Sequence, residues 1–238
     1  MLVLGFDTAT PAVSVALHDG ERVIAAASAL DARRHSELLM PMIATIMADA
    51  GASRSDLTAI AVGVGPGPYT GLRVGLVTAR VLGSVLHLPV SGVCSLDVIA
   101  ASASSAASTA SASPAGPFLV ATDARRKEVY WARYDAAGRR IAGPHVTQAS
   151  AIPDAAGLPV AGAGGPLYPA AFGELIGPAY PDARTLCGLV ARPAGQVPLL
   201  DPEPLYLRRP DAREPGPPKR VTPGQPGGTT PADPLARR

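Results

Sequence analysis

LVLGFDTATPAVSVALHDGERVIAAASA, residues 2–29, predicts three β-strands in succession. The first segment, LVLGFDTA, is a short apolar run, and the second, AVSVALH, alternates. The third, RVIAAASA, follows Asp19-Gly20, a dipeptide typical of tight hairpin turns. Pro11 falls in the first turn, where its missing N–H removes no hydrogen bond from a strand. The chain therefore starts with three strands joined by short turns.

Helical and strand patterns alternate in the next part of the chain. Apolar residues recur at helical spacing between residues 33 and 51, where Gly51 ends the pattern. We then expect a buried strand at 56–65, a helix at 69–87, a strand at 88–95 and a helix that starts at 95. Thr70 is the expected N-cap of the helix at 69–87. The order βββαβαβα is typical of an α/β protein.

The opening pattern returns after residue 113. Residues 100–113 contain only Ala, Ser and Thr, and we expect them to continue the helix and then form a linker. Further strands are expected at 117–125, 128–135 and 139–143, followed by a strand with a glycine loop at 158–165 and a short helix at 166–177. Asp7 and Asp123 hold the same place in the two strand–turn–strand units. The sequence therefore predicts two lobes of related topology, βββαβα, the second of them cut short.

Charge is distributed unevenly along the chain. Of the 21 basic and 19 acidic residues, seven basic and three acidic ones lie in residues 208–238, so residues 1–207 carry 14 and 16 and a net charge of −2. Because nucleic-acid binding is driven by neutralisation of phosphates, this body is a poor primary nucleic-acid binder. We expect a first lobe at 1–113, a smaller second lobe at 114–209, and a disordered tail rich in Pro and Gly at 210–238.

Cysteine content and hydropathy bear on the location of the protein. Cys94 and Cys187 form neither a disulfide framework nor a Cys-x-x-Cys pair. The N-terminal sequence MLVLGFDTAT has no basic start, and Asp7 interrupts its apolar run, so we expect no signal peptide and a reducing compartment. No apolar run reaches the ~18 residues of a membrane span. We therefore expect a cytoplasmic protein that has no contact with the membrane.

The glycine-rich segment GVGPGPYTGLRVGLVTAR, residues 63–80, joins an expected strand to an expected helix, where phosphates often bind. It fits neither G-x-x-x-x-G-K-[ST] nor G-x-G-x-x-G, and Pro66 and Pro68 each remove a backbone N–H that a phosphate would need. DTAT, residues 7–10, leaves two alternatives open: a carboxylate that holds a metal or water beside a nucleotide, or an Asp that caps a turn. The histidines show no metal-ligand spacing; they are His18, His35, His87 and His145.

Five segments together resemble one protein family. They are LGFDTATPAVSVAL, HSELLMPMI, GVGPGPYTGLRVGLVTAR, DARRKEVYWARY and PLYLRRPDA, which follow one another in order between residues 1 and 212. This set is similar to the TsaB family, bacterial subunits of tRNA threonylcarbamoyladenosine biosynthesis. The resemblance implies an actin-like, sugar-kinase-like fold of two lobes, in agreement with the duplicated strand pattern.

The same resemblance implies that the chain is not catalytic. TsaD, the related subunit that transfers threonylcarbamoyl to adenosine 37 of tRNAs reading ANN codons, carries V-N-H-M-E-G-H, with two metal-binding histidines four residues apart. VCSLDVI, residues 93–99, puts Ser95 and Ile99 at those positions, and neither can replace an imidazole ligand. Ala9 stands where active relatives carry Gly, and Pro68-Tyr69 replaces a Ser-Phe pair of the family's loop. We therefore expect no catalytic residue, no bound metal and no cofactor.

The resemblance also implies partners. Members of the family pair with TsaD through two helices of the N-terminal lobe, and the ATPase TsaE associates with that pair. Carried over, the partner face would consist of Leu38, Leu39, Met42, Ile43, Met47, Arg73, Val77 and Arg80. A vestigial nucleotide site, with ATP binding weak if present, would consist of Asp7, Thr8, Thr10, Gly65 and Gly67. Contact with tRNA would be indirect, through the complex.

Two alternatives stay open at this point. The chain could be an ATP-binding enzyme of the same fold, either a small kinase or a glycoprotease-like hydrolase, and would then need an ordered phosphate loop. It could also pair with its own copy when alone, through the same apolar helices. The main expectation is a scaffold that the tRNA-modifying complex requires and that activates TsaD.

Overall fold

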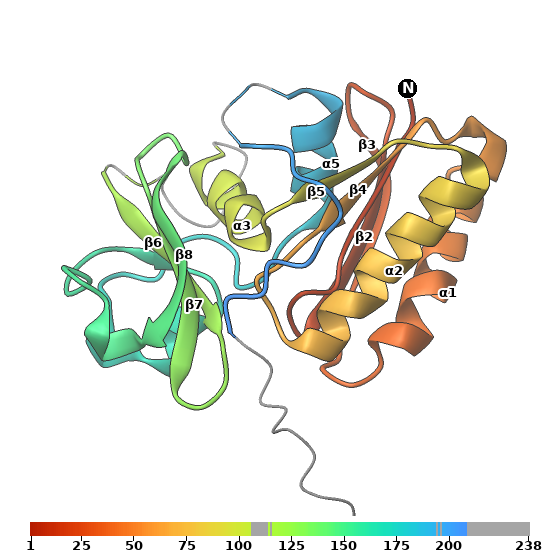
Figure 1. Ribbon diagram of the computed structural model, residues 1–238. Helices are drawn as coiled ribbons and strands as arrows, with labels where there is room; N and C mark the ends of the chain where they lie inside the picture. Colours follow the sequence, from red (N-terminus) through yellow and green to blue (C-terminus); the bar gives the residue numbers. More distant parts are fainter. Residues whose placement is uncertain (106–113, 115, 194, 196, 209–238) are drawn as a thin grey trace, which may run out of the picture. The chain divides into compact units, whose positions relative to one another are not determined.

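The computed structural model describes residues 1–105, 114, 116–193, 195 and 197–208, which belong to one compact unit, Met1–Arg208. Two β-sheets form its framework (Figure 1). The N-terminal elements are β1 (Val3–Asp7), β2 (Ala12–His18), β3 (Val23–Leu30), α1 (His35–Asp49), the 3₁₀-helix η1 (Arg54–Asp56), β4 (Ala59–Gly63), α2 (Tyr69–Leu86), β5 (Val90–Val93) and α3 (Ser95–Ser104). The elements that follow are β6 (Phe118–Asp123), β7 (Glu128–Tyr134), β8 (Arg140–Gln148), η2 (Ala149–Ala151), β9 (Val160–Ala161), α4 (Gly164–Leu167), η3 (Pro169–Ala171) and α5 (Ala183–Ala191).

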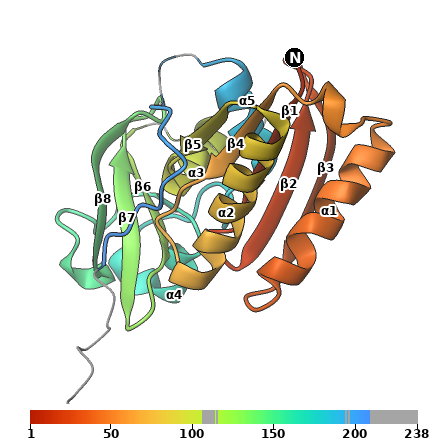
Figure 2. The ribbon, with the colours of Figure 1, turned by 45° about the vertical axis from the view of Figure 1, so that its right-hand side comes forward.

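The first sheet has the strand order β3-β2-β1-β4-β5. β1 pairs antiparallel with β2 and parallel with β4, and β4 pairs parallel with β5. Because successive side chains of a strand point to opposite faces, Leu4 and Phe6 of β1 pack in a core with α1 and α2, whereas Val3 packs in a second core with α5. α1 and α2 therefore cover one face of the sheet (Figure 2), and α5 covers the other.

The second sheet repeats this topology. Its order, β8-β7-β6-β9, matches β3-β2-β1-β4, with antiparallel β6–β7 and β7–β8 pairs and a parallel β6–β9 pair. Within the described residues the sheet has no counterpart of β5, and α4 has only four residues. Asp7 ends β1, and Asp123 ends β6. The predicted actin-like α/β fold, with two related lobes and a reduced second one, is confirmed.

The start of α2 differs from its prediction. Pro68 (φ −57°, ψ 133°), not Thr70, is the N-cap residue, and no side chain caps the helix. Thr70 is the second residue of α2, because Pro68 already turns the chain into the helix. The prediction of Thr70 as N-cap is therefore wrong.

Three predictions in the second half of the chain are also incomplete or wrong. The strand expected at 139–143 extends to Gln148. The helix expected at 166–177 is replaced by α4 and η3, because Pro169 cannot donate the backbone hydrogen bond that a continuous helix needs. α5 was not predicted, although Asp182 is a side-chain cap of its N-terminus.

Some predictions concern residues outside the described part of the chain. These are the linker at 106–113 and the tail at 210–238, so the predicted lobe boundaries at 113/114 and 209/210 stay predictions. Of the helices that the structure describes, none has the length and apolar character needed to cross a membrane.

Candidate functional site

Asp7, at the C-terminal end of β1, is enclosed by hydrogen bonds. Its Oδ2 accepts a hydrogen bond from the Ser95 hydroxyl (2.6 Å), and its Oδ1 accepts one from the Ala9 N–H (2.8 Å). The Ser95 hydroxyl also accepts from the Gly65 N–H (3.2 Å), and the Ser95 N–H donates to the Gly65 carbonyl (2.7 Å). Burial raises the pKa of the Asp7 carboxyl, and the hydrogen bond from Ser95 offsets part of that rise. The network links the end of β1, the glycine loop and the start of α3.

Thr8 connects the turn after β1 to α2. Its hydroxyl donates to the Gly71 carbonyl (2.8 Å) and accepts from the Gly75 N–H (3.0 Å). These two groups are four residues apart, the spacing at which an α-helix pairs a carbonyl with an N–H. A Cβ on Gly71 would lie 2.8 Å from the Thr8 carbonyl oxygen, and one on Gly75 would lie 2.5 Å from the Thr8 hydroxyl. We call this contact of Thr8 with Gly71 and Gly75 the Thr8 clip; it depends on the absence of a side chain at both glycines.

The glycine loop between β4 and α2 also packs against the turn after β1. A Cβ on Gly63 would collide with the Asp7 carboxylate, and a Cβ on Gly67 would collide with the Ala9 carbonyl. Gly65 has a φ of +87°, which L side chains rarely adopt. These glycines therefore have a packing role of their own, close to residues 7–9.

Thr10 is held by α1 and by its own turn. His35 Nε2 donates a hydrogen bond to the Thr10 carbonyl (2.7 Å), and the Thr10 hydroxyl accepts one from the Ala12 N–H (3.3 Å). Of the two alternatives for DTAT, these contacts are those of a capped turn. Nucleotide binding stays a prediction for the residues Asp7, Thr8, Thr10, Gly65 and Gly67.

Ser95 and Ile99 are the residues that the resemblance puts at the histidine positions of the TsaD motif. Ser95 is 1% exposed, and its hydroxyl is engaged with Asp7 and Gly65. Ile99 is fully buried in the core that α3 shares with the second sheet. In the part of the chain that the structure describes, no three His, Cys, Asp or Glu side chains gather as potential metal ligands.

A cleft of about 410 Å³ lies between the turn after β1 and the end of β6. Thr10, Thr122, Asp123 and Tyr180 contribute polar groups, and the other lining residues are alanine, proline and leucine. The Asp123 carboxylate pairs with the Arg125 guanidinium (3.3 Å) and accepts from the Arg125 N–H (2.7 Å). Neither Lys nor Arg is found among the described residues that line the cleft, so its wall offers no positive side chain to a polyphosphate.

α1 directs three of the predicted partner residues into the protein's own core. Leu39, Ile43 and Met47 are at most 8% exposed and pack in the core between α1, α2 and the first sheet. The sheet covers the side of α1 on which these three lie, so they offer little surface to a partner, and their place in the partner face stays a prediction. Leu38 and Met42 are half-buried and contact the same core.

α2 presents the exposed part of the predicted partner face. Arg73, Val77 and Arg80 are exposed, and Val81 and Val85, which the prediction omitted, continue the row from Val77 at intervals of four residues. The three valines are 59%, 54% and 69% exposed, in chain order. We call these five residues the α2 face.

A groove of about 480 Å³ runs between α1 and α2, beside the α2 face. Met40, which is 47% exposed, lines it from α1, and Val74 and Thr78 line it from α2. Met40 was also absent from the predicted face. Exposed apolar residues therefore gather on α2 and on the neighbouring edge of α1.

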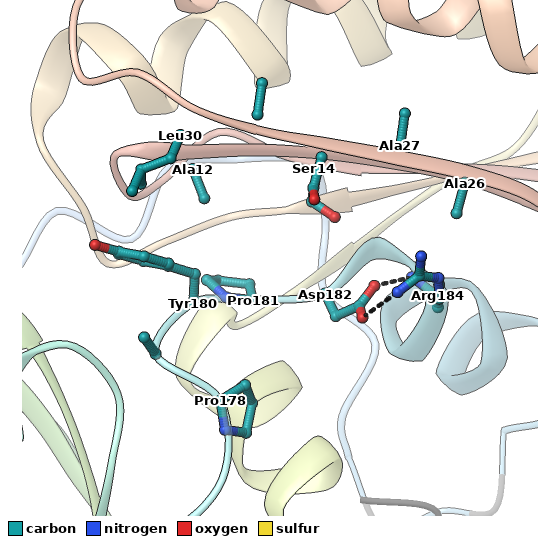
Figure 3. Close-up of a pocket in the computed structure, with 13 residues that line it drawn as sticks. Ala12, Ser14, Ala26, Ala27, Leu30, Pro178, Tyr180, Pro181, Asp182 and Arg184 are labelled. Carbon is teal, nitrogen blue, oxygen red and sulfur yellow. Dashed lines mark hydrogen bonds and ion pairs between the residues drawn. The ribbon is translucent and has the colours of Figure 1, made fainter. Parts of the chain in front are cut away.

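A pocket of about 280 Å³ lies between β3 and the segment before α5 (Figure 3). Asp182 accepts a hydrogen bond from the Arg184 N–H (2.8 Å) and pairs with the Arg184 guanidinium (3.3 Å). The Ser14 hydroxyl accepts from the Ala183 N–H (2.9 Å). The Ser14 hydroxyl therefore holds the N-terminus of α5 on the sheet, and the contacts between Asp182 and Arg184 cap the helix; these roles account for the polar groups in the pocket.

The fold and the site together define an actin-like α/β protein. Hydrogen bonds join the turn after β1 to the glycine loop and to the start of α3. On the surface, α2 exposes an apolar face that also carries two arginines. A family model described as TsaD, tRNA N6-adenosine threonylcarbamoyltransferase, matches residues 28–166. The chain therefore belongs to the TsaD family, and its resemblance to TsaB is confirmed.

Relatives of the chain include proteins of three bacteria. An uncharacterized protein of Mycobacterium tuberculosis is 43% identical over 219 residues, which are 89% of this chain and 93% of the relative. The tRNA threonylcarbamoyladenosine biosynthesis protein TsaB of Escherichia coli is 40% identical over 135 residues, 56% of this chain and 55% of the relative. The crystal structure of a Pseudomonas aeruginosa protein with similarity to the peptidase YeaZ is 30% identical, with a TM-score of 0.72, and the match covers 87% of this chain and 99% of that one.

Proposed function

We propose that this chain is a non-catalytic, activating subunit of the complex that transfers threonylcarbamoyl to adenosine 37 of tRNAs reading ANN codons. It pairs with TsaD through α1 and α2, TsaE joins the pair, and tRNA is contacted through the complex. The names of the TsaB relatives and the TsaD family model support a place in tRNA threonylcarbamoyladenosine biosynthesis.

The hydrogen bond from Ser95 to Asp7 is the observation that carries the non-catalytic role. A metal that orients a donor molecule needs ligands with available lone pairs. The Ser95 hydroxyl donates a hydrogen bond to Asp7 and accepts one from the Gly65 N–H, and Ile99 contributes only hydrocarbon to a core. These contacts favour a subunit that needs neither metal nor cofactor, in which the two positions stabilise the fold.

The α2 face supports the pairing with TsaD. Val77, Val81 and Val85 are each more than half exposed, and contiguous exposed apolar side chains mark sites of protein association. A groove beside the α2 face, lined by Met40 of α1 and by Val74 and Thr78 of α2, adds to the surface that a partner could contact.

A reconstitution experiment tests the proposed function. The chain is co-purified with TsaD from the same organism, and threonylcarbamoyladenosine formation in tRNA is measured with both proteins, with each protein alone and with TsaE. We expect modification only when TsaD and this chain are both present. Transfer by this chain in a preparation free of TsaD, or full activity of TsaD and TsaE without it, would contradict the proposal.

Calorimetry with ATP tests the alternative of an ATP-binding enzyme. The lining of the cleft beside Asp123, without Lys or Arg among its described residues, favours weak binding or none. Tight, Mg²⁺-dependent binding of ATP by the isolated chain would support the enzyme and count against the scaffold.

A further inference from the structure

The α2 face carries charge of one sign. α2 contains two basic residues, Arg73 and Arg80, and no Asp or Glu. They are seven residues apart and therefore lie on the same side of the helix, with Val77 between them. On the neighbouring α1, the acidic Glu37 is already paired with Arg34 (2.8 Å). α2 therefore brings only positive side-chain charge to the α2 face.

A C-terminal segment restrains one of the two arginines. The Tyr206 hydroxyl accepts a hydrogen bond from Arg73 Nε (3.2 Å). This segment is itself attached to the first lobe, since the Leu205 N–H donates to the Val64 carbonyl (2.9 Å). This contact restrains the Arg73 side chain where a partner would approach.

We propose that the α2 face selects a partner helix that carries Asp or Glu beside an apolar stripe, and that its two arginines disfavour pairing with a second copy of this chain. This inference rests on the proposed function and names the feature by which the partner is distinguished from a self-pair. In a dimer that packs the two copies of α2 antiparallel, with a two-fold axis between Leu76 and Val77, Arg73 of one copy lies opposite Arg80 of the other. Like charges that face each other across an interface lower affinity, whereas opposite charges add specificity.

Charge reversal at Arg80 tests the inference in two arms. The first arm measures the affinity of the wild-type chain and of Arg80→Glu for TsaD by calorimetry at low and moderate salt. The second arm measures self-association of the same two proteins by analytical ultracentrifugation. Arg192→Glu is the matched control, since it makes the same change of charge on an exposed arginine after α5, on the opposite side of the first sheet. Circular dichroism verifies that all variants fold.

The affinity for TsaD and the affinity for a second copy should change in opposite directions. Arg80→Glu should weaken TsaD binding about tenfold or more, with a smaller salt dependence, because it places a negative charge against acidic side chains. The same variant should self-associate more tightly than wild type, because the introduced carboxylate of one copy then faces Arg73 of the other. Arg192→Glu should change neither affinity. Any other combination overturns the inference. If wild type binds no TsaD, the proposed function fails, and the self-association arm alone decides the charge argument.

Discussion

Replacing Gly75 with alanine should destabilise the protein, although alanine is the better helix former. The substitution by itself favours the helix by about 1 kcal/mol. Against this gain, the new Cβ would lie 2.5 Å from the Thr8 hydroxyl, which is buried and bonded to both Gly71 and Gly75. The methyl group would displace the hydroxyl and break the Thr8 clip, at a cost of about 1–3 kcal/mol for the hydrogen bonds and about 1–3 kcal/mol for overpacking. We expect a net loss of about 1–5 kcal/mol in the free energy of unfolding.

A double-mutant cycle isolates the clip from the helix propensity. Thr8→Ala removes the hydroxyl and should cost about 1–3 kcal/mol, because the buried carbonyl of Gly71 loses its donor. In the double variant the methyl group introduced by Gly75→Ala no longer meets the hydroxyl, and the helix keeps its propensity gain. The double variant should therefore be about 1 kcal/mol more stable than Thr8→Ala alone, with a coupling of at least about 2 kcal/mol between the two sites.

Urea unfolding followed by far-ultraviolet circular dichroism is the appropriate measurement. The single tryptophan of the chain, Trp131, lies in β7 of the second sheet, so its fluorescence reports on the other lobe. In thermal unfolding, each kcal/mol of lost stability should lower the Tm by about 2–4 °C for a chain of this size. Effects of the two substitutions that add within about 0.5 kcal/mol would refute the account of the clip.

Three further predictions concern the partner helices, the response to pH and the glycines. Leu39→Ala should lower the free energy of unfolding by about 2–5 kcal/mol, because Leu39 is buried. Val77→Asp should change the free energy of unfolding by less than about 0.5 kcal/mol yet abolish co-purification with TsaD. If Val77→Asp were the more destabilising of the two in urea unfolding, the assignment of Leu39 to the core and Val77 to the surface would be contradicted. Because burial raises the pKa of Asp7 in the folded chain, the folded state binds the carboxyl proton of Asp7 more tightly than the unfolded chain does. The stability that this proton contributes to the folded state is therefore lost as the pH rises. Asp7→Asn should therefore gain stability relative to wild type as the pH rises above about 4, the ordinary range of an Asp carboxyl, and a relative loss would count against the raised pKa of Asp7. Gly67→Ala should lower the free energy of unfolding by about 1–3 kcal/mol, because its Cβ would collide with the turn after β1. Gly188→Ala in α5 is the control and should be neutral or stabilising, because a Cβ there meets nothing within 4 Å. Equal Tm values for the two variants would contradict the packing role of Gly67.

The fold was predictable because its pattern is local and occurs twice. The alternation in β2, the hairpin turn at Asp19-Gly20 and the return of the same order at β6 and β7 all lie in short windows of sequence. α5 was missed because it is short and follows a proline-rich segment, so its apolar period spans little more than two turns. Its position on the first sheet depends on contacts with strands far away in sequence, such as the bond between Ala183 and Ser14.

Which residues of α1 and α2 are exposed was only partly predictable from the sequence. α1 has two adjacent apolar columns, one with Leu38 and Met42 and one with Leu39 and Ile43, and either column fits a helix packed on a sheet. Only the position of the sheet shows that the second column is the buried one. On α2 the exposed valines were harder to assign, because the helix is apolar on several sides. Likewise, the bond from Ser95 to Asp7 joins residues 88 apart in sequence, which no local pattern predicts.

The hydrogen-bonded network around Asp7 and the exposed α2 face both result from one packing arrangement. Glycines recur every four residues from Gly63 to Gly75, and each one lets the chain approach residues 7–9 more closely than any side chain would allow. In a phosphate-binding loop, such glycines would leave backbone N–H groups directed at a ligand. Here the Gly65 N–H is directed at Ser95, and the Gly75 N–H is directed at Thr8. The same contacts fix the first turns of α2 against β1, and a helix held in this way presents Val77 at a defined position. The contacts that occupy the loop therefore also preorganise the surface for a partner, which lowers the entropy lost on binding.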